Sequence, residues 1–139
     1  INLCREIKKR KIQNVRIFNK KILIFFEELK SKNLIHEMWI LFPDPWPKTK
    51  HLKRRLIDFN FVNKISFFLM NKARVYIATD CLSYFISIII HFHKSKKFNW
   101  VNDLPHEWNN DREIFQQTKY FKKALINNKK PLFLILEKI

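Results

Sequence analysis

Hydrophobic residues follow two different spacings along the chain, one typical of helices and one typical of strands. Residues 20–32 repeat apolar side chains three and four positions apart, whereas residues 35–42 form a short apolar run that stops at Pro43. Helices are predicted for residues 2–11, 20–32, 59–69, 82–94 and 118–125, the third with Asp58 as N-cap. Strands are predicted for residues 14–18, 35–42, 73–79 and 131–138.

Strands and helices therefore follow one another in turn, which is typical of an α/β fold. Such a fold is a mostly parallel sheet with helices on both faces, and its ligands bind beyond the carboxyl ends of the strands. Residues 98–102 and 131–138 are expected to close the sheet as an antiparallel tail. Asp44 and Asp80 each follow a predicted strand, so both are expected at the ligand-binding edge.

Charge makes this α/β domain unusual. Its 139 residues include 28 Lys and Arg against 12 Asp and Glu, a formal net charge of +16, and a domain this basic is expected to meet phosphate or another anionic surface. The chain also lacks glycine and is rich in Ile, Lys, Asn and Phe, whose codons are rich in A and T. Nucleotide bias can explain part of the lysine excess, so the position of the cations is more informative than their total.

Other classes of protein receive little support. Cys4 and Cys81 lie far apart and in no CxxC pair, so we expect two reduced thiols and neither a zinc site nor a disulfide framework. The longest apolar stretch, residues 84–92, is shorter than the roughly 18 residues of a membrane span. The chain starts with neither a methionine nor a signal peptide. We expect a cytoplasmic protein with no membrane association, whose chain begins within a longer sequence.

The most informative segment is FPDPWPKTKHLKRR, residues 42–55. Pro43 and Pro45 restrict the backbone on both sides of Asp44, which suits a site that needs a carboxylate in one fixed direction. Trp46 offers an aromatic wall. The cations that follow are too concentrated for an ordinary solvated face: Lys48, Lys50, His51, Lys53, Arg54 and Arg55. The alternative, a proline-rich turn without a binding role, stays open.

Asp80 ends the strand before the helix of residues 82–94. Two carboxylates from neighbouring strands can converge on one ligand, and a guanine base donates two parallel hydrogen bonds to a carboxylate from its N1–H and N2–H₂ edge. Its N7 atom stays free on the opposite edge. The alternative is that Asp80 is only the N-cap of the following helix.

Residues 42–55 closely resemble the signature FPDPWPK-(K/R)-x-H-x-K-R-R of the bacterial tRNA guanine-N7 methyltransferases. The resemblance extends through IATD at residues 77–80 and TKYFKKAL at residues 118–125 to the last strand. It implies a Rossmann-like class I methyltransferase that uses S-adenosylmethionine, with no metal, to methylate a guanine in the variable loop of tRNA. Asp44 would be the catalytic residue, next to the methyl donor. Substrate would contact Lys48, Asp80, Thr118, Lys119, Tyr120 and Phe121, and RNA would contact Lys50, His51, Lys53, Arg54 and Arg55.

The chain departs from the family pattern in three ways. The Gly-rich loop and the acidic ribose-binding strand are expected upstream of Ile1. Lys20 and Lys21 stand where a Gly-Asp pair is usual near adenine, and Phe121 replaces a glutamate. We therefore expect residues 1–139 to form a single methyltransferase-like domain without the cofactor loop. Two functions stay open: an enzyme whose cofactor-binding half is upstream or on a separate chain, and a non-catalytic tRNA-binding remnant.

Overall fold

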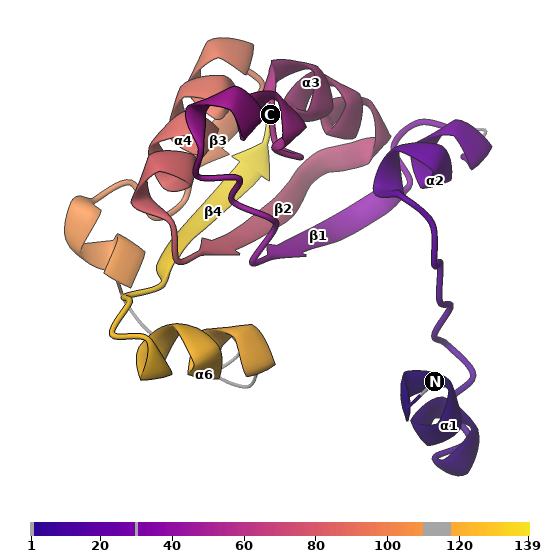
Figure 1. The fold of residues 1–139 in the computed structure, drawn as a ribbon. Helices are drawn as coiled ribbons and strands as arrows, with labels where there is room; N and C mark the ends of the chain where they lie inside the picture. Colours follow the sequence, from indigo (N-terminus) through magenta and orange to yellow (C-terminus); the bar gives the residue numbers. More distant parts are fainter. Residues whose placement is uncertain (1, 30, 110–117) are drawn as a thin grey trace. The chain divides into compact units, whose positions relative to one another are not determined.

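The computed structural model describes residues 2–29, 31–109 and 118–139 (Figure 1). They divide into two compact units, an N-terminal unit of residues 1–30 and a main unit of residues 31–139, and each is described by itself. The prediction of one domain over the whole chain stays a prediction. None of the helices in the described ranges has the length and apolarity that a bilayer crossing requires. Cys4 and Cys81 are both free thiols.

The N-terminal unit contains two short helices, α1 (Asn2–Lys9) and α2 (Ile22–Glu28). The spacing of apolar residues predicts both. The basic residues in the last turn of α1 are Lys8 and Lys9, where the partial negative charge of the helix end favours cations. Glu6 and Arg10 add an exposed ion pair one turn apart, at 3.2 Å.

The strand predicted for residues 14–18 is wrong. The backbone there belongs to no strand, and Val15 and Ile17 keep 41% and 47% of their surface exposed. Phe18 packs edge to face against Phe25 of α2 instead, with ring centroids 5.3 Å apart. An alternating segment forms a strand only where a neighbouring strand satisfies its backbone groups, and none within the described residues does so.

The main unit is built on one four-stranded sheet. Its strands are β1 (Ile35–Leu41), β2 (Leu69–Thr79), β3 (Phe98–Trp100) and β4 (Leu132–Lys138), in the spatial order β1-β2-β4-β3. β1 and β2 are parallel, while β4 runs antiparallel to both β2 and β3. This open, mixed sheet confirms the α/β, Rossmann-like class and the antiparallel C-terminal tail.

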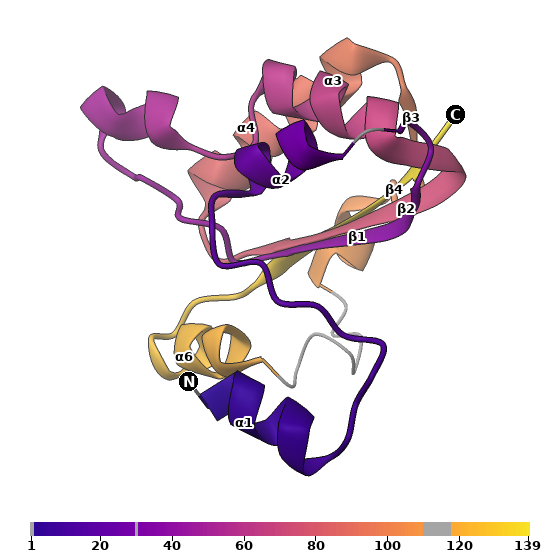
Figure 2. The same cartoon turned by 90° about the vertical axis from the view of Figure 1, so that its right-hand side faces the viewer.

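Helices lie on both faces of this sheet, as Figures 1 and 2 show. Helices α3 (Phe59–Phe68) and α4 (Leu82–Ser95) pack on each other and on one face of β2. Helix α6 (Lys119–Ile126) packs on the opposite face. Two short 3₁₀-helices, η1 (Thr49–Arg54) and η2 (Pro105–Asn109), lie in the connections.

The alternation of side chains along β2 explains this layering. Val75 and Ile77 are fully buried and point to the face covered by α3 and α4, because successive strand residues point to opposite faces. Ala78 points the other way and forms a buried cluster with Phe121 of α6 and Phe133 of β4. Burying a phenylalanine in this way contributes about 1.5–3 kcal/mol, so this cluster fixes α6 to the sheet.

Asp58 begins α3, as the sequence predicts. Its carboxylate accepts a hydrogen bond from the backbone N–H of Phe61 at 2.7 Å, which satisfies one of the unpaired donors of the first helical turn. The buried face of α3 comprises Phe61, Val62, Ile65, Ser66 and Phe68. β2 starts at Leu69, directly after this helix, and is therefore four residues longer at its beginning than the predicted strand.

Candidate functional site

Asp44 and Asp80 follow the ends of two strands that are direct neighbours in the sheet. β1 and β2 pair in parallel as far as Leu41 and Ala78, and Phe42 then donates its backbone N–H to the Ala78 carbonyl at 2.8 Å. Adjacent strands lie about 4.8 Å apart. Both aspartates therefore leave the sheet at the same edge, and what they bind there stays a prediction.

The loop that carries Asp44 has a constrained backbone. Phe42 and Trp46 on either side of it have positive φ angles of 51° and 40°, a region that non-glycine residues seldom occupy and that costs on the order of 1–3 kcal/mol each. Pro43 and Pro45 fix two further φ angles. Asp44 itself is exposed and forms no hydrogen bond or ion pair with any residue that the structure describes. Its carboxylate is thus held on a stiff segment and is open to a ligand.

Asp80 is half-buried and already has one partner. Its Oδ2 atom accepts a hydrogen bond from the Lys129 ammonium at 2.9 Å, which is the main cause of the raised pKa of Lys129. Helix α4 has Cys81 as its N-cap, so the alternative that Asp80 is the N-cap is wrong. A carboxylate offers about four acceptor positions, and Asp80 can therefore accept from a ligand while Lys129 stays in place.

Arg55 ties the Asp44 loop to α4. It is 9% exposed, and its Nε donates to the Pro45 carbonyl at 2.8 Å, while Nη1 and Nη2 donate to the carbonyl and hydroxyl oxygens of Ser83 at 3.1 and 2.9 Å. The guanidinium also lies over the Tyr84 ring, 4.8 Å from its centre. Arg55 thus joins the loop after β1 to the helix after β2. Its predicted role in RNA binding is untested, and its burial favours a structural role.

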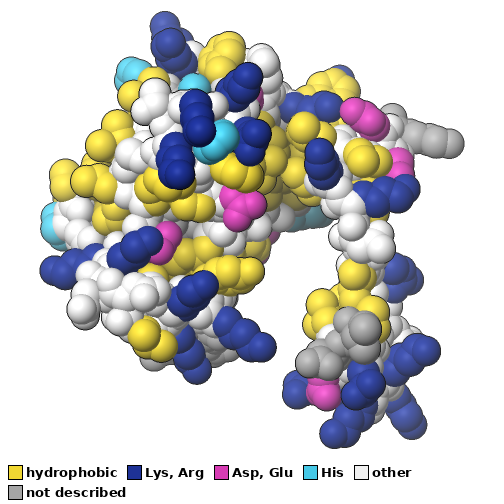
Figure 3. All heavy atoms as spheres, viewed as in Figure 1, with side chains coloured by type: hydrophobic (Ala, Val, Ile, Leu, Met, Phe, Trp, Pro, Cys, Tyr) yellow, Lys and Arg dark blue, Asp and Glu magenta, His cyan; other side chains and the backbone are white. Residues whose placement is uncertain are grey.

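The remaining cations of residues 48–55 lie on different sides of η1, because this helix has about three residues per turn. His51 and Arg54 both contact the Trp46 ring, at 5.7 and 5.0 Å between centres. Lys50 and Lys53 are exposed on another side of η1, and within the described ranges neither has a hydrogen bond or ion pair. Lys48, just before η1, is exposed as well. Figure 3 shows Lys and Arg side chains gathered over η1.

The segment predicted to line the guanosine pocket, Thr118 to Phe121, is split between surface and core. Thr118 is the N-cap of α6 and accepts from the backbone N–H of Phe121 at 3.0 Å. Lys119 and Tyr120 are exposed, and the Tyr120 ring stacks on Phe42, next to the Asp44 loop, with centroids 6.2 Å apart. Phe121 is only 3% exposed, so its side chain contributes to the core rather than to a surface site.

Comparison with known proteins identifies the family of this chain. A protein family described as "Putative methyltransferase" matches residues 1–134. The chain belongs to this methyltransferase family. It is also similar to curated proteins named tRNA (guanine-N(7)-)-methyltransferase, three of which are described below, and this confirms the family resemblance seen in the sequence.

These relatives come from different bacteria. The protein of Leptospira interrogans is 39% identical over 95 residues, or 68% of this chain and 44% of the relative. That of Wolbachia pipientis wMel is 32% identical over 131 residues, 89% of this chain and 56% of the relative. That of Rhodospirillum rubrum is 26% identical over 127 residues, which is 91% of this chain and 49% of the relative. The chain therefore spans about half the length of the curated relatives that it matches.

Methyltransferase family membership raises the question of the methyl donor, and the described residues do not make a complete site for S-adenosylmethionine. The chain has no glycine that would let the backbone approach a nucleotide closely. Lys20 forms an ion pair with Glu28 at 3.3 Å, and Lys21 is the N-cap residue of α2 without a side-chain cap bond. Neither lysine can accept a hydrogen bond from an adenine amino group. These two positions therefore do not fit the adenine end of the donor.

Sequence reasoning missed the residues that support the candidate site. Arg55 donates a hydrogen bond to Ser83 and lies over the ring of Tyr84. Lys129 donates a hydrogen bond to Asp80. These partners are 28, 29 and 49 positions away from the residues that they contact, so no local pattern reveals them. One signal was present: Arg55 is the second of two adjacent arginines in a chain whose other cations are mostly lysines.

Proposed function

We propose that the complete protein that contains these residues transfers a methyl group from S-adenosylmethionine to N7 of a guanine in the variable loop of tRNA. The 139 residues of this chain carry the tRNA-facing side of that enzyme, and the donor-binding residues lie on another segment or a separate chain. The reaction takes place in the cytoplasm and requires no metal.

The observation that carries this proposal is the placement of Asp44 and Asp80 at one edge of two paired, parallel strands. The exposed lysines of η1 begin six residues after Asp44. A carboxylate pair beside a basic surface fits a base whose edge donates hydrogen bonds and whose backbone carries phosphates. The names of the relatives support the same substrate.

The carboxylates position and stabilise the base. Neutral guanine N7 has an open lone pair and no proton, so it can attack a methyl group without a strong general base. The protein contributes orientation, which can replace several kcal/mol of a barrier, and negative charge near the purine as it becomes cationic. Asp44 is the more exposed of the two carboxylates, whereas the negative charge of Asp80 is partly neutralised by the ion pair with Lys129.

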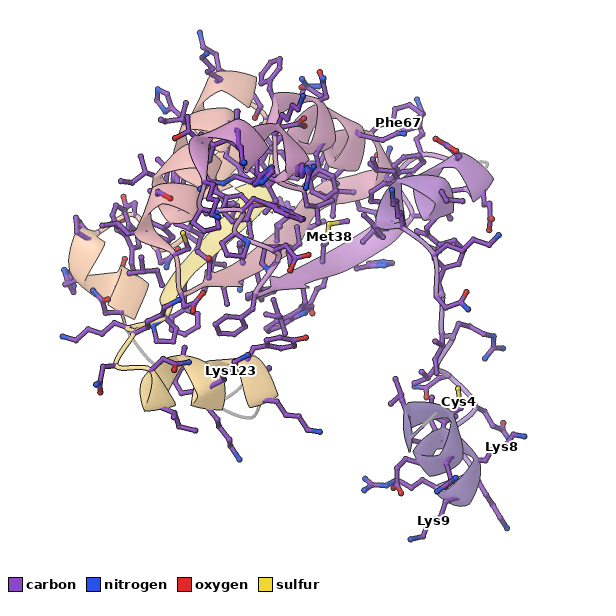
Figure 4. The ribbon with its side chains drawn as sticks, in the orientation of Figure 1. Cys4, Lys8, Lys9, Met38, Phe67 and Lys123 are labelled. Carbon is purple, nitrogen blue, oxygen red and sulfur yellow. The ribbon has the colours of Figure 1, made fainter. Side chains whose placement is uncertain are left out.

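The exposed lysines hold the tRNA backbone. Lys50 and Lys53 on η1 face solvent beside the Asp44 loop, and contacts of this kind give affinity and register rather than choice of sequence. The N-terminal unit carries further cations, and Figure 4 shows Lys8 and Lys9 directed outward from α1.

Replacing Lys50 and Lys53 together by alanine is expected to weaken tRNA binding and to lower the slope of log Kd against log salt by about one for each lysine. The slope is measured by fluorescence anisotropy with labelled tRNA at several salt concentrations. Lys96 and Lys97 are exposed lysines between α4 and β3, at the opposite end of the sheet from the two aspartates, and provide the matched double variant. An unchanged slope in the Lys50 and Lys53 variant would remove η1 from the RNA surface.

The proposed function is tested by incubating the complete protein with tRNA and methyl-labelled S-adenosylmethionine and by analysing the nucleosides of the digested tRNA. Label in 7-methylguanosine supports the proposal. Label in any other nucleoside contradicts the assigned substrate atom. Tight tRNA binding with no label at all would favour the non-catalytic remnant.

A further inference from the structure

A second candidate site lies between η1 and α4, next to the two aspartates. It is an open pocket of about 500 Å³, lined by Pro47, Thr49, Leu52, Arg55, Ser83, Ile86, Ser87, Ile90 and His91. Arg55 and Ser83, which brace the Asp44 loop, form part of one wall. The other lining residues are separate from that contact.

The pocket lies close to the candidate active site. Pro47 is three residues from Asp44, and Ser83 is three residues from Asp80. Three extended residues span at most about 10 Å, so each wall of the pocket begins within that distance of one carboxylate. Figure 2 shows η1 standing away from the sheet on the same side as α3 and α4.

Apolar and polar side chains both line the pocket. Leu52 of η1 and Ile86 and Ile90 of α4 are exposed apolar residues. Ser87 and His91 are one helical turn apart on α4, so they lie on the same face. An exposed apolar surface with a few polar groups is typical of a ligand site.

His91 has an unused hydrogen-bonding atom. Its Nδ1 is buried and has no hydrogen-bond partner among the described residues. Burial is the main cause of its lowered pKa, with Lys94 acting in the same direction and Asp58 in the opposite one. Near neutral pH the imidazole is therefore uncharged and carries one donor and one acceptor.

Exposed lysines lie on the two helices that line this pocket. The period of η1 places Thr49 and Leu52 on the pocket side of η1, and Lys50 and Lys53 are the residues that directly follow them. Lys94 is exposed on α4, one turn beyond His91. An apolar lining, a neutral imidazole and nearby exposed lysines together match a nucleobase with its phosphates, because RNA-binding proteins take up unstacked bases and hydrogen-bond their edges.

We propose that the pocket between η1 and α4 receives a second, unmethylated base of the tRNA, extruded from the stack beside the guanine at the sheet edge. This proposal rests on the proposed function for the identity of the RNA. The base lies against Leu52, Ile86 and Ile90, and its polar edge meets Ser87 and His91. Lys50 and Lys53 bind the phosphates on either side.

The proposal is tested with two single-stranded RNA oligonucleotides of equal length and charge, one with all its bases and one with abasic positions. The protein is expected to bind the complete oligonucleotide about tenfold more tightly, equivalent to about 1.4 kcal/mol, because the abasic oligonucleotide lacks the base that would bury the apolar lining of the pocket. Ser87→Trp fills the pocket and is expected to lose most of this preference while keeping its affinity for the abasic oligonucleotide. Ser95→Trp on the same helix, outside the pocket, is expected to keep it.

A second variant covers the case in which Ser87→Trp does not fold, which circular dichroism would reveal. His91→Phe keeps an aromatic ring, removes the buried unpaired nitrogen and is expected to reduce the preference several-fold. Full preference in either folded variant, or equal binding of both oligonucleotides by the original protein, would overturn the proposal. Because this assay involves no methyl transfer, its outcome is separate from that of the labelling experiment.

Discussion

Asp44→Asn in the complete protein is expected to lower the rate of methyl transfer to tRNA at least 100-fold, while tRNA affinity changes only a few-fold. Asparagine keeps the shape of the side chain and one acceptor oxygen but removes the negative charge that stabilises the cationic purine. The substitution leaves the proposed phosphate contacts on η1 in place, so binding is expected to persist. The measurement is single-turnover transfer of labelled methyl groups, together with tRNA binding by anisotropy.

The matched control is Asp103→Asn, an exposed aspartate that follows β3 on the far side of β4. This variant is expected to transfer methyl groups at the original rate. If Asp44→Asn behaved in the same way, Asp44 would have no catalytic role and the constrained loop would be only a turn.

Arg55→Ala is expected to lower the free energy of unfolding by about 3 kcal/mol. The substitution removes three hydrogen bonds from a buried guanidinium and leaves the Pro45 and Ser83 carbonyl oxygens without their donor. It also releases a loop with positive φ angles at Phe42 and Trp46. Arg55→Lys keeps the charge but lacks the planar fork that reaches both acceptors, so it is expected to recover less than half of the loss. Urea unfolding, followed by tryptophan fluorescence, gives these values.

Arg54→Ala serves as the control for this prediction. Arg54 is exposed and contacts the Trp46 ring, an interaction that contributes about 0.5–1 kcal/mol at exposed sites. A loss in Arg55→Ala no larger than that in Arg54→Ala would mean that the guanidinium does not hold the loop. Arg55→Ala is also expected to slow methyl transfer, because Asp44 would then be poorly positioned.

The elements that local pattern determines were predicted well. β1 ends where proline interrupts an apolar run, and Asp58 caps α3 because its carboxylate reaches a donor three residues away. The predicted strand at residues 14–18 shows the limit of this approach. Its alternation is as regular as that of a true strand, but a strand depends on a partner that the local sequence does not specify.

The candidate site was only partly predictable for a similar reason. The motif at residues 42–55 locates Asp44 and the cations, but the motif alone gives Arg54 and Arg55 the same role. Their surroundings differ: one stacks on Trp46 at the surface, and the other is buried against Ser83 and Tyr84. Phe121 shows the same limit. Its side chain belongs to the core because α6 packs on the sheet, and the local sequence does not reveal that packing.

The carboxyl ends of β1 and β2 are the centre of the candidate site. Asp44 and Asp80 follow these two strand ends, and Arg55 fixes the loop that carries Asp44. We expect carboxylate oxygens at this edge to accept hydrogen bonds from the side of the base that distinguishes guanine from hypoxanthine, which lacks the N2 amino group. The resulting preference concerns affinity alone and needs no methyl donor.

The most direct measurement compares the affinity of the protein for tRNA with guanosine or inosine at the methylated position. Loss of one hydrogen bond to a charged acceptor corresponds to about 1.5–3 kcal/mol, so guanosine is expected to bind at least tenfold more tightly. The Asp44→Ala/Asp80→Ala double variant, which has no side-chain acceptor at either position, is expected to bind both tRNAs equally. Equal binding by the original protein, or an undiminished preference in the double variant, would contradict the assignment of these carboxylates to the guanine.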